Sequence, residues 1–299
     1  MPRPGRFLAL AVLLAAATAT AASPRPKPLR LGVVNFYNPR LMYIKYQPLV
    51  DYLSRQTGQV WELALATSYQ STVDELCAGR LDVAYLGPFT YARAHEQCGA
   101  VPVVQLRSRG STAFRSSILV RNDSAVRSIA DLRGRSIGFG APLSTSSHLV
   151  PREMLERAGL RPGVDFTCRY YDHHERAARA VLLGDVEACA VRDLVGERFV
   201  QRGLRVLAQS EPMPNFPLVL APGQRAKVRD DLVRVLVDVP AADAKVRAAI
   251  AAWDVELAGG FAVCQDAQFD GVRSLAAGLF GPAALRLPES ALTCASGEP

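Results

Sequence analysis

The sequence predicts an α/β fold with two lobes, each built on a parallel-rich sheet that carries helices on both faces. Two observations predict it. Short apolar runs rich in β-branched residues alternate with stretches of helical apolar spacing, as in strands joined by right-handed helical crossovers. This alternation occurs twice along the 299 residues, and two extended segments separate the two series. A chain of this length can bury one large core or two smaller ones.

The first series supplies most of the first lobe. Its short apolar runs predict strands, and apolar residues at helical spacing predict the helices that follow each strand. The strands are expected at 31–36, 60–66 and 81–87, and the helices at 46–56, 72–78 and 89–97. Two extended segments, 103–107 and 115–121, come next and lead toward the second series.

The second series has the same alternation. Strands are expected at 136–140, 166–171 and 187–191, and helices after the hydroxyl cluster 144–147, at 174–183 and at 194–201. Three prolines between 212 and 217 then interrupt the pattern before further helices. We therefore assign residues 28–118 and 216–299 to lobe 1 and residues 119–215 to lobe 2. The two connections, near Val120 and 212–216, are expected to act as a hinge.

Residues 1–22 have the pattern of a secretory signal peptide. Two arginines precede the apolar run 7–17, and small residues follow to Ala22. The run is too short to cross a bilayer, which takes roughly 20 residues. Because no Cys stands just after Ala22, we expect no lipid anchor. The expected location is the periplasm.

The charge pattern excludes one class of partner. The chain has 35 Lys and Arg against 28 Asp and Glu, a net charge of +7. These basic residues are dispersed, and no basic run of the kind that marks a nucleic-acid surface occurs. We therefore expect a weak preference for anions and no nucleic-acid partner.

The cysteine count predicts disulfides. In an oxidising compartment an even number of cysteines favours three bridges. Pairing of sequence neighbours, 77 with 98, 168 with 189 and 264 with 294, would keep each bridge inside one lobe. The absence of any C-x-x-C and the presence of only four His argue against zinc, so we expect no metal or cofactor. The cysteines are Cys77, Cys98, Cys168, Cys189, Cys264 and Cys294.

The strongest functional signal is a run of four hydroxyls, Ser144 to Ser147, between a predicted strand and a predicted helix. The first four N–H groups of a helix lack intrahelical partners, and the helix dipole places partial positive charge there. One hydroxyl is enough for a cap. The others can point outward with the amides and hold a phosphate-like anion without a lysine. The alternative is an ordinary polar cap or loop.

The string S-T-S-x-x-L-V-P at 144–151 resembles periplasmic phosphonate-binding proteins, the substrate-binding components of phosphonate, phosphite and phosphate-like ABC importers. Further segments resemble the same family in the same order along the chain. This resemblance implies the type II periplasmic binding protein fold, with two lobes joined by a two-crossing hinge. The segments are YQPLVDYLSRQTG (46–58), SYQSTVDELCAGRLDVAYLGPFTYARA (68–94), SSILVRNDSAVRSIADLRG (116–134), SIADLRGRSIGFG (128–140) and HERAARAVLLGDVEACAV (174–191).

The resemblance also implies a ligand site. Ser144, Thr145 and Ser146 would cradle the phosphonyl oxygens, and Tyr69 would donate its hydroxyl from the other lobe. His174, at the start of a helix, would donate a hydrogen bond to the anion from one ring nitrogen. Glu175 or a backbone carbonyl would hold the other ring nitrogen in place. We expect this ring to be chargeable at mildly acidic pH. His173 competes for the role, and His148 is expected to be structural.

Departures from the family pattern bear on the ligand. Phe114 stands where aminoalkylphosphonate binders carry a tyrosine. The two acids that hold an ammonium in those relatives match Leu194, beside Asp193, and Phe216. An ammonium left without a counter-charge would cost several kcal/mol. We therefore expect a small oxyanion or an alkyl- or arylphosphonate, with Phe114 and Phe216 as apolar walls.

These observations predict a monomeric solute-binding protein. It would capture a phosphonate, phosphite or phosphate between the lobes and deliver it unchanged to the permease of an ABC importer. The alternative is the same fold acting as the ligand-sensing partner of a signalling receptor. A secreted phosphoester hydrolase using Ser144 and His174 is less favoured, because no G-x-S-x-G nucleophile motif or metal-ligand cluster is present.

Overall fold

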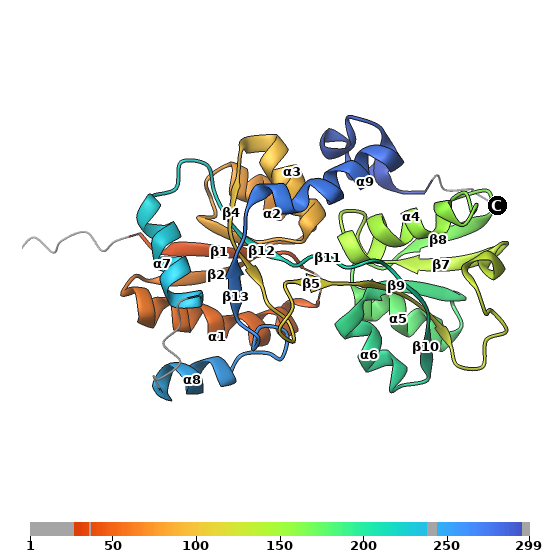
Figure 1. The fold of residues 1–299 in the computed structure, drawn as a ribbon, viewed down its shortest axis with the longest axis horizontal. Coiled ribbons are helices and arrows are strands. Elements are labelled where there is room, and N and C mark those ends of the chain that lie inside the picture. Colours follow the sequence, from red (N-terminus) through yellow and green to blue (C-terminus); the bar gives the residue numbers. More distant parts are fainter. Residues whose placement is uncertain (1–26, 36, 238–243, 295–299) are drawn as a thin grey trace, which may run out of the picture.

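The computed structural model describes residues 27–35, 37–237 and 244–294. The predicted signal peptide, residues 1–22, lies outside this part. Two sheet-containing halves lie side by side along the longest axis, as Figure 1 shows. Among the described residues, no helix combines the length and apolarity needed to cross a bilayer. The predicted α/β class with two sheets is confirmed.

A six-stranded sheet forms the core of the first half, in the order β13-β4-β12-β3-β1-β2. β1 pairs in parallel with β2 and β3, whereas β12 and β13 pair antiparallel with their neighbours. The sheet is therefore mixed and less parallel than predicted, because the chain returns from the second half to add β12. Its strands are β1 (Leu29–Val33), β2 (Trp61–Leu65), β3 (Val83–Tyr85), β4 (Val101–Leu106), β12 (Pro217–Leu220) and β13 (Phe261–Val263).

Helices cover both faces of this sheet, and Figure 1 shows α2 and α3 on one side with α1 and α8 on the other. α1 begins earlier than predicted because Asn38 caps it, accepting from the Leu41 amide at 3.0 Å, and Pro39 takes a position that needs no N–H donor. The helices are α1 (Pro39–Thr57), α2 (Tyr69–Cys77), α3 (Pro88–Cys98), α7 (Ala226–Leu236), α8 (Ala244–Ala251) and α9 (Asp270–Phe280).

A five-stranded sheet forms the second half, in the order β10-β6-β9-β7-β8. β7 pairs in parallel with β8 and β9, so the carboxyl ends of these three strands lie at one edge. The strands are β6 (Ser116–Arg121), β7 (Arg135–Phe139), β8 (Phe166–Tyr170), β9 (Ala188–Arg192) and β10 (Leu204–Gln209). The helical elements are η1 (Ile129–Leu132), η2 (Thr145–Leu149), α4 (Val150–Arg157), α5 (His174–Leu183) and α6 (Asp193–Val200).

Two crossings connect the halves and pair with each other. β5 (Ala113–Phe114) and β11 (Met213–Pro214) form an antiparallel two-stranded ribbon. Val120, expected near the hinge, is instead fully buried inside β6. The division into lobes at 118/119 and 215/216 stays a prediction about which parts move together.

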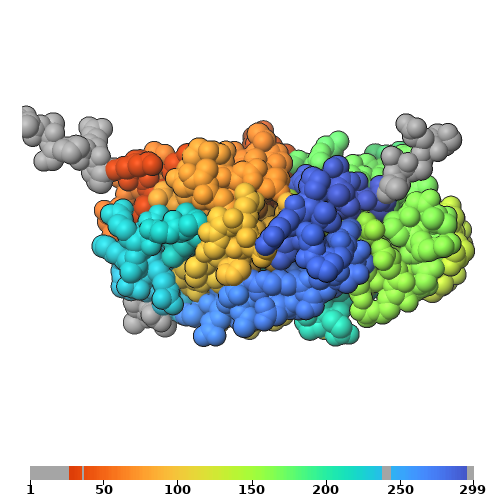
Figure 2. All heavy atoms as spheres, turned by 90° about the horizontal axis from the view of Figure 1, so that it is seen from above, coloured from red at the N-terminus to blue at the C-terminus, as the bar shows by residue number. Residues whose placement is uncertain are grey.

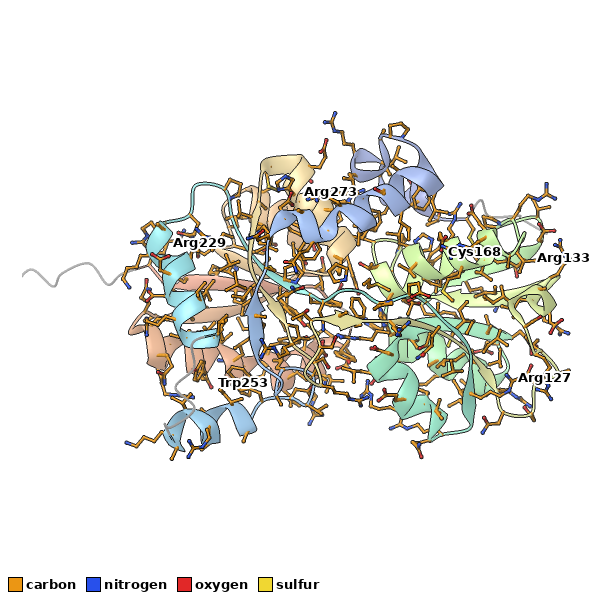
Figure 3. The ribbon with its side chains drawn as sticks, in the orientation of Figure 1. Arg127, Arg133, Cys168, Arg229, Trp253 and Arg273 are labelled. Atoms are coloured by element: carbon orange, nitrogen blue, oxygen red, sulfur yellow. A yellow bond between two sulfur atoms is a disulfide. The ribbon has the colours of Figure 1, made fainter. Side chains whose placement is uncertain are left out.

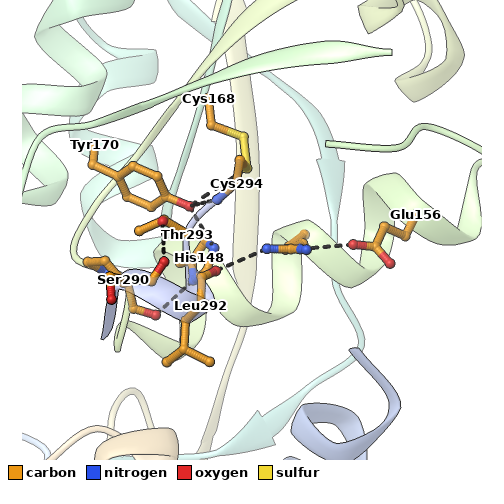
Figure 4. The surroundings of a disulfide bond; sticks show 10 residues. His148, Glu156, Cys168, Tyr170, Ser290, Leu292, Thr293 and Cys294 are labelled. Atoms are coloured by element: carbon orange, nitrogen blue, oxygen red, sulfur yellow. Dashed lines mark hydrogen bonds and ion pairs between the residues drawn. A yellow bond between two sulfur atoms is a disulfide. The ribbon is translucent and has the colours of Figure 1, made fainter. Parts of the chain in front are cut away.

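The C-terminal segment runs back across the second half. α9 packs against both α3 and α4, and Figure 2 shows this segment lying across the junction of the two halves. The segment then ends against the five-stranded sheet, where Cys294 joins Cys168 of β8 (Figure 4). Its remaining elements are η3 (Asp266–Phe269), η4 (Ala284–Arg286) and α10 (Glu289–Leu292).

The disulfide prediction is partly wrong. The bridge between Cys77 and Cys98 is confirmed and joins α2 to α3. The predicted pairs 168–189 and 264–294 do not form, because Cys168 joins Cys294 and both Cys189 and Cys264 are buried free thiols. The prediction assumed that residues up to 299 stay with the first sheet, whereas the segment before Cys294 packs on the second.

The dispersed charge expected from the sequence is visible on the molecule. Figure 3 places Arg127 and Arg133 at the outer end of the second half and Arg229 at the opposite end of the molecule. Arg127 and Arg133 flank the short helix η1, whereas Arg229 lies in α7. They do not gather into one basic face.

Candidate functional site

The hydroxyl cluster lies where β7 ends and η2, a single π-helical turn, begins. Ser144 is the N-cap, and its Oγ accepts a hydrogen bond from the Ser147 amide at 3.1 Å. η2 continues directly into α4, so the amides at this end belong to a longer helical segment. π-turns of this kind are rare and frequently occur at functional sites. All four hydroxyl side chains are buried.

The four hydroxyls have different partners. Ser147 Oγ accepts from the Gly140 amide at 2.7 Å and donates to the carbonyl of Ala190 in β9. It therefore ties the helical turn to the sheet. Thr145 Oγ1 accepts from the Phe89 amide of α3 at 2.9 Å, across the two halves. Ser146 Oγ is buried without a hydrogen-bond partner within the described part of the chain.

Gly140 permits this close approach. A Cβ at this position would stand 2.8 Å from Ser147 Oγ and 3.2 Å from the His174 ring. Any larger residue would displace the hydroxyl that fixes the turn. The glycine that ends the predicted strand is therefore a packing requirement of the site.

Tyr69 meets the cluster from the first half. It is the first residue of α2, which Ser68 caps by accepting from the Ser71 amide at 3.0 Å. Burial raises the pKa of Tyr69 well above its usual range, and a hydrogen bond with the Ser144 hydroxyl opposes this rise. The Tyr69 phenol is therefore neutral at physiological pH and keeps its proton.

His174 lies beside Ser144, at the start of α5. Its Nε2 is 3.1 Å from Ser144 Oγ, and its Nδ1 accepts from the Arg192 amide at 3.2 Å. Because Nδ1 is an acceptor, Nε2 carries the proton of the neutral ring. Burial, with smaller effects from Arg192 and His173, lowers the pKa of His174 to about 3. The expectation that this ring charges at mildly acidic pH is wrong.

The residues beside His174 have other partners. Glu175 forms an ion pair with Arg198 at 2.9 Å and does not orient the His174 ring. His173 Nδ1 lies 3.0 Å from the Asn35 carbonyl oxygen, in the first half. His148 is fully buried between the Pro142 carbonyl oxygen, 2.7 Å from Nδ1, and the Tyr170 hydroxyl, 3.0 Å from Nε2, as Figure 4 shows in part.

Phe114 and Phe216 lie together where the crossings meet the site, with ring centroids 5.4 Å apart. Phe216 Cε1 and Thr145 Oγ1 both border Gly87, at 3.6 and 3.5 Å from the position of a Cβ there. Phe216 also stacks on Tyr85 at 5.3 Å. An aromatic wall therefore adjoins the hydroxyl cluster.

A buried ion pair that was not predicted from the sequence lies in this wall. Arg192, at the end of β9, is 0 % exposed, and its Nη1 donates to Glu256 Oε1 from the first half. Glu256 Oε1 also accepts from the Tyr85 hydroxyl at 3.3 Å. The Arg192 guanidinium lies 5.1 Å from the Phe114 ring centroid and 4.8 Å from that of Phe216.

A signal for Arg192 was present in the sequence, because a lone arginine ends the apolar run 187–191 of a predicted strand. The resemblance to the family pointed instead to Asp193 and Leu194. The Asp193 carboxylate accepts from the backbone amides of Arg115 at 2.9 Å and Leu194 at 2.8 Å. It therefore stabilises the backbone next to the crossing β5. Glu256 lies in a turn for which the sequence offered no comparable signal.

Two α/β halves with mixed sheets, two paired crossings and hydroxyl donors enclosed between the halves define a class, the two-lobed type II solute-binding proteins. Within that class, the model of one family matches residues 31–269. The chain belongs to this family, the phosphonate ABC transporter periplasmic substrate-binding proteins.

Curated relatives cover part of the chain. It is 28% identical over 170 residues to "Phosphate-import protein PhnD" of Mycolicibacterium smegmatis, which is 53% of each protein. It is 23% identical over 223 residues to "Tetrathionate sensor histidine kinase TtrS" of Salmonella typhimurium, covering 66% of this chain and 37% of that one. The chain thus spans about half the length of the first relative and less of the second.

Solved structures share the fold. A binding component of an ABC phosphonate transporter from Pseudomonas aeruginosa has a TM-score of 0.75 at 21% identity, with 90% of each chain covered. PhnD1 from Prochlorococcus marinus, in complex with methylphosphonate, has a TM-score of 0.73 at 17% identity, with 86% of this chain and 99% of that chain covered. At these identities the likeness establishes the fold.

Proposed function

We propose that this protein is a periplasmic solute-binding protein that captures a phosphonate or related phosphorus oxyanion between its two lobes and delivers it to an ABC importer. Tyr69, Ser144, Thr145, Ser146 and His174 are the proposed ligand-binding residues, with Phe114 as an apolar wall. We propose that the protein acts as a monomer and needs no cofactor. Membership of the substrate-binding family supports this proposal.

The observation that carries the proposal is the Ser146 hydroxyl. It is buried, has no partner in the described residues, and stands in the first turn of a helical segment beside Ser144 and Thr145. A buried polar group without a partner costs about 1–3 kcal/mol. An oxyanion bound at this turn would remove that cost and accept from neutral donors in a dry site.

The Ser144–His174 contact does not support hydrolysis. A serine nucleophile needs a base nitrogen that accepts its proton. His174 Nε2 instead carries the ring proton, because Nδ1 accepts from the Arg192 amide. Burial, the largest cause, lowers the pKa of His174 to about 3, which makes the ring a weak base. We propose that the ligand leaves chemically unchanged.

A sensing role is the second candidate function. The match to the tetrathionate sensor kinase covers 66% of this chain, which is the observation that favours it. In that case the closed form would contact a receptor instead of a permease. The oxyanion site itself would be the same, so the two functions differ in the partner and not in the ligand-binding residues.

Titration calorimetry with methylphosphonate, phosphite, phosphate and sulfate tests the proposed function. At least one phosphorus oxyanion is expected to bind, because neutral hydroxyl donors stand with backbone amides at the start of a helical segment. Replacement of Thr145 by Ala is expected to weaken that binding by roughly 1–3 kcal/mol. No heat with any phosphorus oxyanion at saturating concentrations contradicts the proposal.

A further inference from the structure

Arg192 has an unused hydrogen-bonding edge. Its guanidinium is fully enclosed, and within the described part of the chain Nη1 donates to the carboxylate of Glu256, with the Tyr85 hydroxyl beside this pair. Nε and Nη2 are buried with no hydrogen-bond partner among the described residues. These two atoms lie on the same side of the planar group, so their N–H bonds form the fork that fits two oxygens of one oxyanion.

We propose that this edge of Arg192 binds a second oxyanionic group of the ligand, so that the natural ligand is an organophosphonate carrying a carboxylate or similar group. This inference rests on the proposed function, because it assumes that the first oxyanion occupies the hydroxyl cluster. It differs from the sequence-based expectation of an alkyl- or arylphosphonate, which needs no charged partner beside Phe114 and Phe216.

The two binding elements are adjacent but distinct. The His174 ring links Ser144 to the backbone of Arg192, with Nε2 3.1 Å from Ser144 Oγ and Nδ1 3.2 Å from the Arg192 amide nitrogen. The guanidinium itself lies against the aromatic wall, 4.8 Å from the Phe216 ring centroid. Phe216 in turn borders the same glycine as Thr145. On this proposal, a ligand of a few carbons places one oxyanion at each element.

The local charge favours an acceptor over an ammonium at this second element. One carboxylate oxygen of Glu256, Oε1, already accepts from Arg192 and from the Tyr85 hydroxyl. A ligand ammonium would meet the Arg192 cation. A ligand carboxylate would instead give two charge-assisted hydrogen bonds to donors that otherwise stay buried and unsatisfied.

Titration calorimetry with a matched pair of ligands tests this inference. Ethylphosphonate and 3-phosphonopropionate share the phosphonate and differ by the terminal carboxylate, and 2-aminoethylphosphonate places an ammonium at that end. The carboxylate ligand is expected to bind at least about tenfold more tightly than ethylphosphonate, as expected for charge-assisted hydrogen bonds. The ammonium ligand is expected to bind at least about tenfold more weakly than ethylphosphonate.

Two variants test whether Arg192 causes the preference for the carboxylate ligand. Arg192→Gln combined with Glu256→Gln removes both charges together, so that no unpaired carboxylate stays buried. In this double variant, the ratio of the Kd for ethylphosphonate to the Kd for 3-phosphonopropionate is expected to fall to about one. Arg192→Lys keeps the charge but removes the fork, and the ratio is expected to fall at least about threefold.

The outcomes separate the two proposals. Binding of ethylphosphonate with no preference for the carboxylate ligand overturns this inference and leaves the proposed function standing. Retention of the full preference in the double variant overturns it as well. An equal loss of both ligands in Arg192→Lys shows that Arg192 binds the phosphonate itself and also overturns it. If neither phosphonate binds the wild-type protein, both proposals fail.

Discussion

Ser146 and Ser147 are neighbours on one helical turn with different hydrogen-bond partners, and this contrast can be tested. We predict that Ser146→Ala weakens phosphonate binding by roughly 1–3 kcal/mol with little loss of stability, because the lost hydroxyl has no partner within the described ranges. Ser147→Ala is expected to lower the free energy of unfolding by about 1–3 kcal/mol, because it removes two buried hydrogen bonds, one from the Gly140 amide and one to the Ala190 carbonyl, each contributing about 0.5–1.5 kcal/mol.

The two variants serve as controls for each other. Calorimetry with methylphosphonate measures the binding change, and urea unfolding measures the stability change. If Ser146→Ala destabilises the fold as much as Ser147→Ala does, the Ser146 hydroxyl has a structural role. If Ser146→Ala leaves binding unaltered, the placement of the oxyanion at this turn is wrong.

The buried histidines predict a pH dependence of stability. Burial, the largest cause, lowers the pKa of His148 from its ordinary 6.5 to about 3. Between these values the unfolded chain binds the proton and the folded chain does not, so the free energy of unfolding falls as the pH is lowered. The expected slope is up to about 1.4 kcal/mol per pH unit for each such histidine.

His148→Gln is expected to remove its share of this slope. Urea unfolding at about pH 7 and about pH 5 measures it in the wild type and the variant. His95→Gln, at a partly exposed position, is the matched control. The same slope in wild type and His148→Gln contradicts the prediction. The slope is the measurement to compare, because the substitution also removes the hydrogen bonds to Pro142 and Tyr170.

The residues that the sequence selected as neutral donors lie close together in the structure. Tyr69, Ser144 and His174 come from segments far apart in the chain, and the structure brings them into contact. Their functional role stays a prediction. Arg192 and Glu256 were missed because a charge inside an apolar region becomes informative only when its burial is known. The two residues of this pair are 64 positions apart in the sequence, and local sequence patterns do not reveal such contacts.

At the element scale the alternation of strands and helices was predictable, because each element has a local cause. Capping residues set helix starts that apolar spacing alone placed too late, as Asn38 does for α1 and Ser68 does for α2. The antiparallel strands β12 and β13 were not predicted as such. Their direction depends on where the chain returns after the second half, which is a property of the whole fold.

The disulfides also show that local sequence patterns predict near contacts and not distant ones. The bridge between Cys77 and Cys98 joins consecutive helices, and the proximity of these helices follows from the local α/β pattern. The bridge between Cys168 and Cys294 spans 126 residues and depends on the C-terminal segment leaving the first sheet. The segment is held there by Arg152, which donates to the Leu292 carbonyl at 3.0 Å, and by Tyr170, which accepts from the Cys294 amide at 3.1 Å (Figure 4).

At the scale of the whole molecule, the contacts between the halves are those expected of a closed binding protein. The Phe89 amide donates to Thr145, Arg192 pairs with Glu256, and Arg109 pairs with Glu197 at 2.5 Å. The first two contacts enclose the candidate site, whereas the third lies at the exposed surface near the crossings. We predict that opening of the lobes breaks the enclosed contacts, and that a bound oxyanion adds to these contacts and so favours the closed form.

The C-terminal segment provides a third connection between the halves, and we expect this connection to limit opening. It starts on the first half, crosses along α9 and is covalently attached to β8 through Cys168 and Cys294. We predict that Cys168→Ala with Cys294→Ala increases the radius of gyration of the ligand-free protein in small-angle scattering, because the two crossings then remain as the only covalent restraint between the halves. Cys77→Ala with Cys98→Ala removes a bridge inside one half and is the matched control. Saturating methylphosphonate should return the first variant to the radius of the liganded wild type, since closure depends on the site and not on the bridge. An unchanged radius in the ligand-free variant, or the same increase in the control, means that the ribbon of β5 and β11 sets the opening by itself.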